Sequence, residues 1–133
     1  EIYKKITSVN SIIHNHPIFG TGFSILQKKI EAYHYLIGLF GGIDVRCTDF
    51  HLPGSMELAR AIVKSLKNRN VTLIANHGVV TVGNDLDETL YLSEQFEAMC
   101  KQITISRING VPKKIPLGEM KKILVDIKNY LKK

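Results

Sequence analysis

Three histidines are the residues of this chain whose types and spacing could bind a metal ion. His14 and His16 stand two residues apart in an HxH motif, and His77 lies in an NHG motif at residues 76–78. Because residues i and i+2 of a strand point to the same face, His14 and His16 are predicted to lie side by side. A third imidazole brought in by the fold would complete a site with three protein ligands. Such a site leaves a position for water or substrate, as catalytic zinc sites do.

The HxH pair by itself has a simpler interpretation. Two neighbouring histidines are commonly surface or core-edge residues, and two ligands do not make a metal site. The metal interpretation therefore depends on the fold bringing His77 to His14 and His16. In that case three ring nitrogens would favour Zn2+ over Mg2+ or Ca2+, with Co2+ or Mn2+ as substitutes.

The segments around these histidines have the composition of β-strands. Residues 8–15 are predicted to form a strand that ends at the HxH motif, and Pro17 closes it. Residues 71–75 and 79–82 are two further β-type runs, with the NHG motif between them. Gly78 is expected to permit a backbone conformation that other residues resist. A histidine held between two buried strands would be rigidly placed, as a metal ligand must be.

The remaining segments alternate between helical and extended patterns. Apolar spacing predicts helices over residues 18–28, from Ser55 to about Lys67, from Asp85 onward and from about Gly118. Ser55 and Asp85 are expected to cap their helices, with Glu57 and Glu88 in the first turns. The apolar stripe of the third helix is predicted at Leu86, Leu90, Phe96, Met99, Cys100 and Ile103. Extended pieces are predicted at residues 29–33 and 45–50, which indicates a mixed α/β class.

The composition fits one ordinary domain and excludes several classes of protein. The chain has 133 residues, of which 44% are hydrophobic, enough for a single core. No apolar stretch reaches the roughly 18 to 20 residues that span a bilayer. Two cysteines, Cys47 and Cys100, do not make a disulfide framework and are predicted to be small buried hydrophobes. With no secretory signal in the sequence, a cytoplasmic location is expected.

The net charge of +6 is concentrated near the C-terminus, where residues 110–133 contain seven lysines against Glu119 and Asp126. Nucleic-acid binding would require base-stacking aromatics or a known module beside such a patch, and this tail supplies only Tyr130. The lysines are therefore predicted to form the solvated face of a helix. Neither nucleic acid nor a membrane is expected as a partner, although an anionic small substrate would be attracted by this charge.

The histidine motifs and the segments between them resemble the class II aldolase/adducin family, and within it the L-fuculose-1-phosphate aldolases. The matching residues are Ser11–His16, Ala32–Ile37, Gly41-Gly42, Glu57-Leu58, Asn76–Val80 and Gly83. HxH followed by NHG at this separation is specific, and the His34-Tyr35 segment favours the fuculose-type enzymes. The resemblance implies an α/β fold of three layers, αβα, with a central, mainly antiparallel sheet flanked by helices. It also implies a single domain over residues 1–133.

The resemblance further implies a class II, metal-dependent aldehyde-lyase. It would be a zinc-dependent aldolase cleaving a sugar phosphate of the L-fuculose 1-phosphate type into dihydroxyacetone phosphate and an aldehyde. His14, His16 and His77 would bind the zinc ion, which stabilises the enediolate left when the carbon–carbon bond breaks. Tyr35 and Tyr130 match tyrosines that act in this family at active sites between the subunits of a homotetramer. Both also have a packing interpretation, Tyr35 as an aromatic anchor and Tyr130 beside the last apolar stripe.

Three alternatives to this aldolase are compatible with the motifs. An L-ribulose-5-phosphate 4-epimerase of the same family would carry the same HxH and NHG motifs. Family members also have a segment before the HxH strand that supplies phosphate-binding residues and an acid completing the metal shell. Glu1 lies too close to His14 for that role, so the chain is expected to lack the N-terminal part of the domain. An inactive metal-binding fragment and an adducin-like, non-catalytic module are the other two alternatives.

Overall fold

Five strands form one sheet at the centre of the structure, a computed structural model that describes residues 1–130. They are β1 (Ser11–Asn15), β2 (Ile30–Glu31), β3 (Asp44–Cys47), β4 (Val71–Ile74) and β5 (Gly78–Gly83). Their order across the sheet is β1-β5-β4-β3-β2. Neighbouring strands are antiparallel except for β3 and β4, which are parallel. The prediction of a mainly antiparallel sheet is therefore confirmed.

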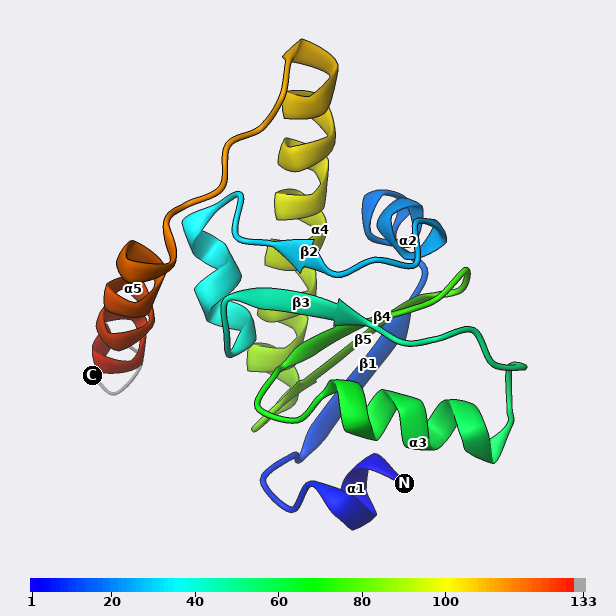
Figure 1. The fold of residues 1–133 in the computed structure, drawn as a ribbon. Coiled ribbons are helices and arrows are strands. Elements are labelled where there is room, and N and C mark those ends of the chain that lie inside the picture. The colour runs from blue at the N-terminus through cyan, green and yellow to red at the C-terminus, as the bar shows by residue number, and fades with distance from the viewer. Residues whose placement is uncertain (131–133) are drawn as a thin grey trace.

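Helices cover both faces of this sheet (Figure 1). They are α1 (Ile2–Lys5), α2 (Ile18–Ile25), the 3-10 helix η1 (Tyr35–Phe40), α3 (Met56–Ser65), α4 (Leu86–Asn109) and α5 (Leu117–Tyr130). Figure 1 shows α3 in front of the sheet and the long α4 behind it, with α5 outside η1. This arrangement confirms the predicted three-layer αβα fold. Within residues 1–130, no helix combines the length and apolarity needed to cross a membrane.

Two hydrophobic cores lie on the two faces of the sheet, because successive side chains of a strand point in opposite directions. Val71 and Leu73 of β4 pack with Phe96 of α4 in the larger core. Ile74, at the end of the same strand, packs with Leu58 of α3 in the smaller one. Both faces of β4 and β5 are therefore buried, which explains why their sequences are nearly continuous apolar runs.

Several predicted boundaries differ from the structure. The first strand begins at Ser11 rather than residue 8, and the strand predicted over residues 45–50 ends at Cys47. In α4, Leu86 and Leu90 are 64% and 48% exposed, so their place in the predicted apolar stripe is wrong. The buried stripe passes through Thr89 instead. Leu90 follows it by one residue, which turns the side chain about 100° away on the helix.

Both predicted helix caps are present. The Ser55 hydroxyl accepts the Leu58 N–H at 3.1 Å at the start of α3. The Asp85 carboxylate accepts the Glu88 N–H at 2.8 Å at the start of α4, and Glu88 in turn accepts the Asn84 N–H at 2.7 Å. These side chains satisfy backbone donors that a helix leaves without partners in its first turn.

Asp85→Ala is therefore expected to lower the free energy of unfolding by about 1 kcal/mol, because the first turn of α4 loses its cap. Urea denaturation followed by circular dichroism measures this change. Asp87→Ala is the matched control, since it removes the same charge from the first turn but no cap hydrogen bond. Equal losses in the two variants would show that charge, and not capping, accounts for the effect.

Candidate metal centre

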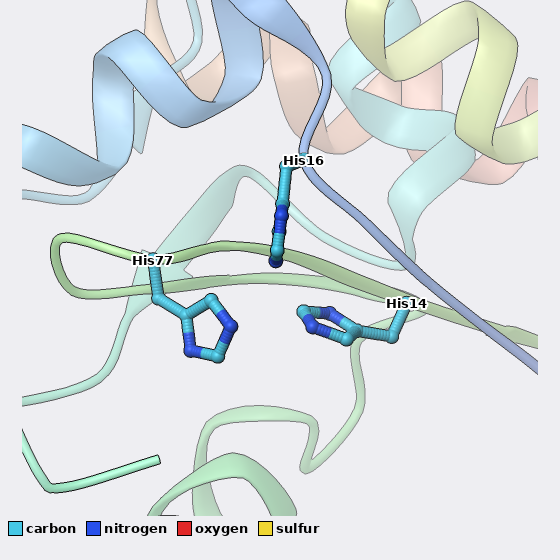
Figure 2. A group of neighbouring side chains, drawn as sticks. All are labelled: His14, His16 and His77. Carbon is cyan, nitrogen blue, oxygen red and sulfur yellow. The ribbon is translucent and has the colours of Figure 1, made fainter.

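The fold brings His14, His16 and His77 together. His14 lies on β1, His16 follows the last residue of β1, and His77 lies in the loop that joins β4 to β5. The ring centroids are 4.9 to 5.0 Å apart in all three pairs, and one nitrogen from each ring lies within 4.8 Å of the others. Figure 2 shows the three rings pointing toward a common space. Among the described residues, no Asp, Glu or Cys joins this group.

The pairing of β1 with β5 places the HxH side chains on one face of the sheet. His14 lies opposite Val80, which faces the smaller core beneath α3. Asn15 points to the other face, where its amide donates a hydrogen bond to the Ser93 hydroxyl of α4 at 3.1 Å. The predicted arrangement, with His14 and His16 side by side, is therefore confirmed.

A backbone carbonyl selects the tautomer of neutral His14. Its Nδ1 lies 2.9 Å from the carbonyl oxygen of Val79. A carbonyl can only accept a hydrogen bond, so Nδ1 must carry the proton and donate it. In the neutral ring, Nε2 then keeps its lone pair, which is the form that binds a metal ion. Metal-binding histidines are commonly oriented by such a hydrogen bond from the other ring nitrogen.

His77 also has the properties of a metal ligand. Burial lowers the pKa of its imidazole, and the positive charge of protonated His14 or His16 would lower it further. The ring is therefore favoured in its neutral form, which metal binding requires. Among the described residues, its buried Nδ1 has no hydrogen-bond partner. The three imidazoles thus fit a divalent cation that prefers nitrogen ligands.

The expectation that Gly78 adopts a backbone conformation which other residues resist is wrong, because its φ is not positive. The residue with positive φ in this loop is Asn76, at +54°, a conformation that Asn tolerates better than most residues. Gly78 is needed for space instead. A Cβ at this position would lie 2.5 Å from Cδ2 of His16 and 2.6 Å from the carbonyl oxygen of Asn15. Asn before the histidine and Gly after it therefore perform different tasks.

Tyr35 does not join the histidines of its own chain. It begins η1, which leads into the start of β3, whereas His77 follows the end of the parallel strand β4 (Figure 1). The residue is 54% exposed, and its ring stacks on that of His34 at a centroid distance of 5.0 Å. Tyr130 is the last residue of α5, and its side chain lies outside the part of the chain that the structure describes.

The remaining histidines and the cysteines lie outside the histidine group. His34 caps η1, since its Nδ1 accepts the Leu36 N–H at 3.2 Å, and His51 lies in the segment before α3. Burial raises the pKa of the Cys47 thiol to about 11, and burial also raises that of Cys100. Both thiols are therefore protonated at neutral pH, as expected for residues that do not act as nucleophiles.

Comparison with known proteins gives matches over most of the chain. Residues 1–104 match the family model described as Class II Aldolase and Adducin N-terminal domain. The L-fuculose phosphate aldolase of Haemophilus influenzae is 34% identical over 98 residues, which cover 74% of this chain and 45% of the relative. The 5-methylthioribulose-1-phosphate/5-deoxyribulose-1-phosphate aldolase of Rhodospirillum rubrum is 28% identical over 130 residues, covering 98% of this chain and 59% of that relative.

A solved structure has the same fold. An L-fuculose 1-phosphate aldolase superposes with a TM-score of 0.90 at 28% sequence identity, covering 95% of this chain and 59% of the other. The chain spans about half the length of the curated relatives it matches.

Proposed function

Because this chain belongs to the class II aldolase and adducin N-terminal domain family, we propose that it works as a metal-dependent aldolase acting on a sugar phosphate. The observation that carries this proposal is the convergence of His14, His16 and His77, with one nitrogen of each within 4.8 Å of the others. Adducin-like, non-catalytic use of the fold would give no reason to keep three imidazoles in this arrangement. The proposed domain comprises residues 1–133, and both free cysteines are compatible with a reducing cytoplasm.

The proposed role of the three histidines is to hold a divalent cation, with zinc as the first choice and Co2+ or Mn2+ as substitutes. When bound, the cation would act as a Lewis acid that stabilises the negative charge developing as the carbon–carbon bond breaks. The Val79 carbonyl keeps the proton of His14 on Nδ1, and burial favours the neutral form of His77. The first feature would leave Nε2 of neutral His14 free to bind the cation, and the second would favour the ligand form of His77.

The proposed substrates are ketose 1-phosphates, which yield dihydroxyacetone phosphate and an aldehyde when the bond between C3 and C4 breaks. L-Fuculose 1-phosphate is the first candidate, because the fuculose-phosphate aldolases include the 34% identical relative and the structure with TM-score 0.90. 5-Deoxyribulose 1-phosphate is the second. Its support is that the match to the Rhodospirillum rubrum aldolase extends over 98% of this chain, against 74% for the first relative.

Tyr35 and Tyr130 are proposed to act at contacts between subunits of a tetramer. The exposure of Tyr35 supports a role outside its own histidine group. Its helix η1 ends beside Asn70, at the start of β4, whereas His77 follows the end of that strand. A phenol can donate a proton or hydrogen bond to a developing alkoxide, which suits the departing aldehyde. Analytical ultracentrifugation and mixing of Tyr35→Phe subunits with His14→Ala subunits would test this role.

The activity can be tested with the purified chain of residues 1–133 loaded with zinc. We expect equimolar bound zinc by mass spectrometry and release of dihydroxyacetone phosphate from one of the two ketose 1-phosphates in a coupled assay. Removal of the metal with a chelator should reduce turnover to background, and added zinc should restore it.

Three other outcomes would contradict the aldolase proposal in different ways. Epimerised pentose from L-ribulose 5-phosphate without released dihydroxyacetone phosphate would identify an epimerase. Bound zinc without turnover on any substrate would identify an inactive metal-binding fragment. Absence of bound zinc, cobalt and manganese would leave the three histidines without the proposed role.

A further inference from the structure

The helix α2 connects the two chain segments that carry the histidines. Its first residue, Ile18, comes two positions after His16. Its other end contacts the loop before His77, because the Asn76 N–H donates to the carbonyl oxygen of Ser24 at 3.1 Å. In addition, the side-chain amide of Gln27 donates to Oδ1 of Asn76 at 2.6 Å. A movement of α2 would therefore displace the loop of His77 relative to His16.

The start of α2 is held by a carboxylate from α4. Pro17 occupies the N-cap position and makes no side-chain cap hydrogen bond. Glu97 performs this task from outside the helix, since its Oε1 accepts the Phe19 N–H at 2.9 Å and its Oε2 accepts the Gly20 N–H at 2.8 Å. A negative charge at this end of a helix is also favoured by the helix dipole.

The same turn of α2 is packed tightly against the sheet. A Cβ on Gly20 would lie 3.0 Å from the Phe96 ring and 3.1 Å from the Val79 side chain. Val79 is the residue whose carbonyl accepts the hydrogen bond from His14. The carboxylate of Glu97 thus caps the same turn of α2 that packs against Val79, on the strand that orients His14.

We propose that Glu97 is a positioning residue for the histidine site. By holding the first turn of α2, it holds the Asn76 loop at the other end of the helix in the place that brings His77 to His16. This inference rests on the proposed metal centre. Glu97 itself is not a metal ligand, because it does not belong to the histidine group.

Glu97→Gln tests the proposal with a change of almost no volume. Gln offers one acceptor oxygen, so one of the two backbone N–H groups loses its partner and faces an NH2 group. We expect zinc affinity, measured by competition with a chelator, to fall about 10- to 100-fold, as when the supporting shell of other metal sites is changed. Glu94→Gln is the matched control, because it removes the same charge from an exposed position of α4. It should bind zinc within about twofold of the unchanged chain.

A second variant acts at the opposite end of α2 and separates positioning from stability. Gln27 has a φ of +50°, so Gln27→Gly removes its hydrogen bond to Asn76 while relieving backbone strain. We expect its melting temperature to match or exceed that of the unchanged chain, while zinc affinity falls several-fold. A merely structural role for this contact would leave zinc affinity unaltered.

Hydrogen exchange in the metal-free protein gives a readout that does not depend on zinc. The Asn76 amide should exchange faster in Glu97→Gln than in Glu94→Gln if α2 transmits the change. Unaltered exchange and unaltered zinc affinity in Glu97→Gln would overturn the positioning role and leave the proposed metal centre intact. Failure of the unchanged chain to bind metal would overturn both proposals.

Discussion

His14→Ala is expected to lower zinc affinity by roughly two to three orders of magnitude. Structural zinc sites with four ligands are worth about 10 to 16 kcal/mol in total, or roughly 2.5 to 4 kcal/mol for each ligand. Removing one of three imidazoles should cost at least one such share, because the remaining two lie about 5 Å apart and cannot enclose the ion. Isothermal titration calorimetry of the metal-free chain measures the loss directly.

Thermal unfolding provides an independent measurement of the same loss. A ligand present at 100 times its dissociation constant stabilises the folded state by about 2.7 kcal/mol. Zinc should therefore raise the melting temperature of the unchanged chain, and this increase should disappear in His14→Ala. His51→Ala is the control, because His51 lies outside the histidine group and should keep the zinc-dependent increase. An undiminished increase in His14→Ala would refute the proposed ligand set.

Gly78→Ala is expected to damage both the fold and the site. The new methyl group would lie 2.5 Å from the His16 ring and 2.6 Å from the carbonyl oxygen of Asn15. The ring can rotate away, but the carbonyl belongs to β1, so the pairing of β1 with β5 must open. Overpacking of this kind costs about 1 to 3 kcal/mol, and a backbone clash should reach the upper end. Zinc affinity should fall as well, because His16 must leave its place beside His14.

Gly22→Ala is the matched control and should act in the opposite direction. Gly22 lies within α2, and nothing lies within 4 Å of a Cβ built on it. Alanine favours a helix over glycine by about 0.8 to 1 kcal/mol, so this variant should be more stable than the unchanged chain. Chemical denaturation of the two variants gives the comparison. Equal stability of Gly78→Ala and the unchanged chain would show that β1 can shift without cost.

The histidine pair and the main elements could be predicted because their signals are local. Alternation in the strand fixes the common face of His14 and His16, and the apolar runs on either side of the NHG motif predict β4 and β5. The caps at Ser55 and Asp85 follow from side chains that bond to backbone within the next three residues. Such interactions need no knowledge of the rest of the fold.

The supports of the site could not be predicted in the same way. Glu97 caps α2 although it lies 78 residues after Phe19 and 77 residues after Gly20 in the sequence. Its sequence context is that of an ordinary charged residue on a long helix. The Val79 carbonyl that orients His14 is a backbone group, which no residue type reveals. The need for Gly78 likewise arises from the packing of β1 against β5, and the conformational preference of glycine suggested a different cause.

The hydrogen bond from His14 to the Val79 carbonyl does not depend on which side chain stands at position 79. Every residue type has the same backbone carbonyl oxygen, so a substitution at position 79 can change the packing of the core while His14 keeps its proton on Nδ1. Because a backbone atom selects the tautomer of this ring, most single-residue substitutions at position 79 leave the tautomer unchanged. A change that alters the path of the backbone, such as a proline or an inserted residue, would remove this hydrogen bond.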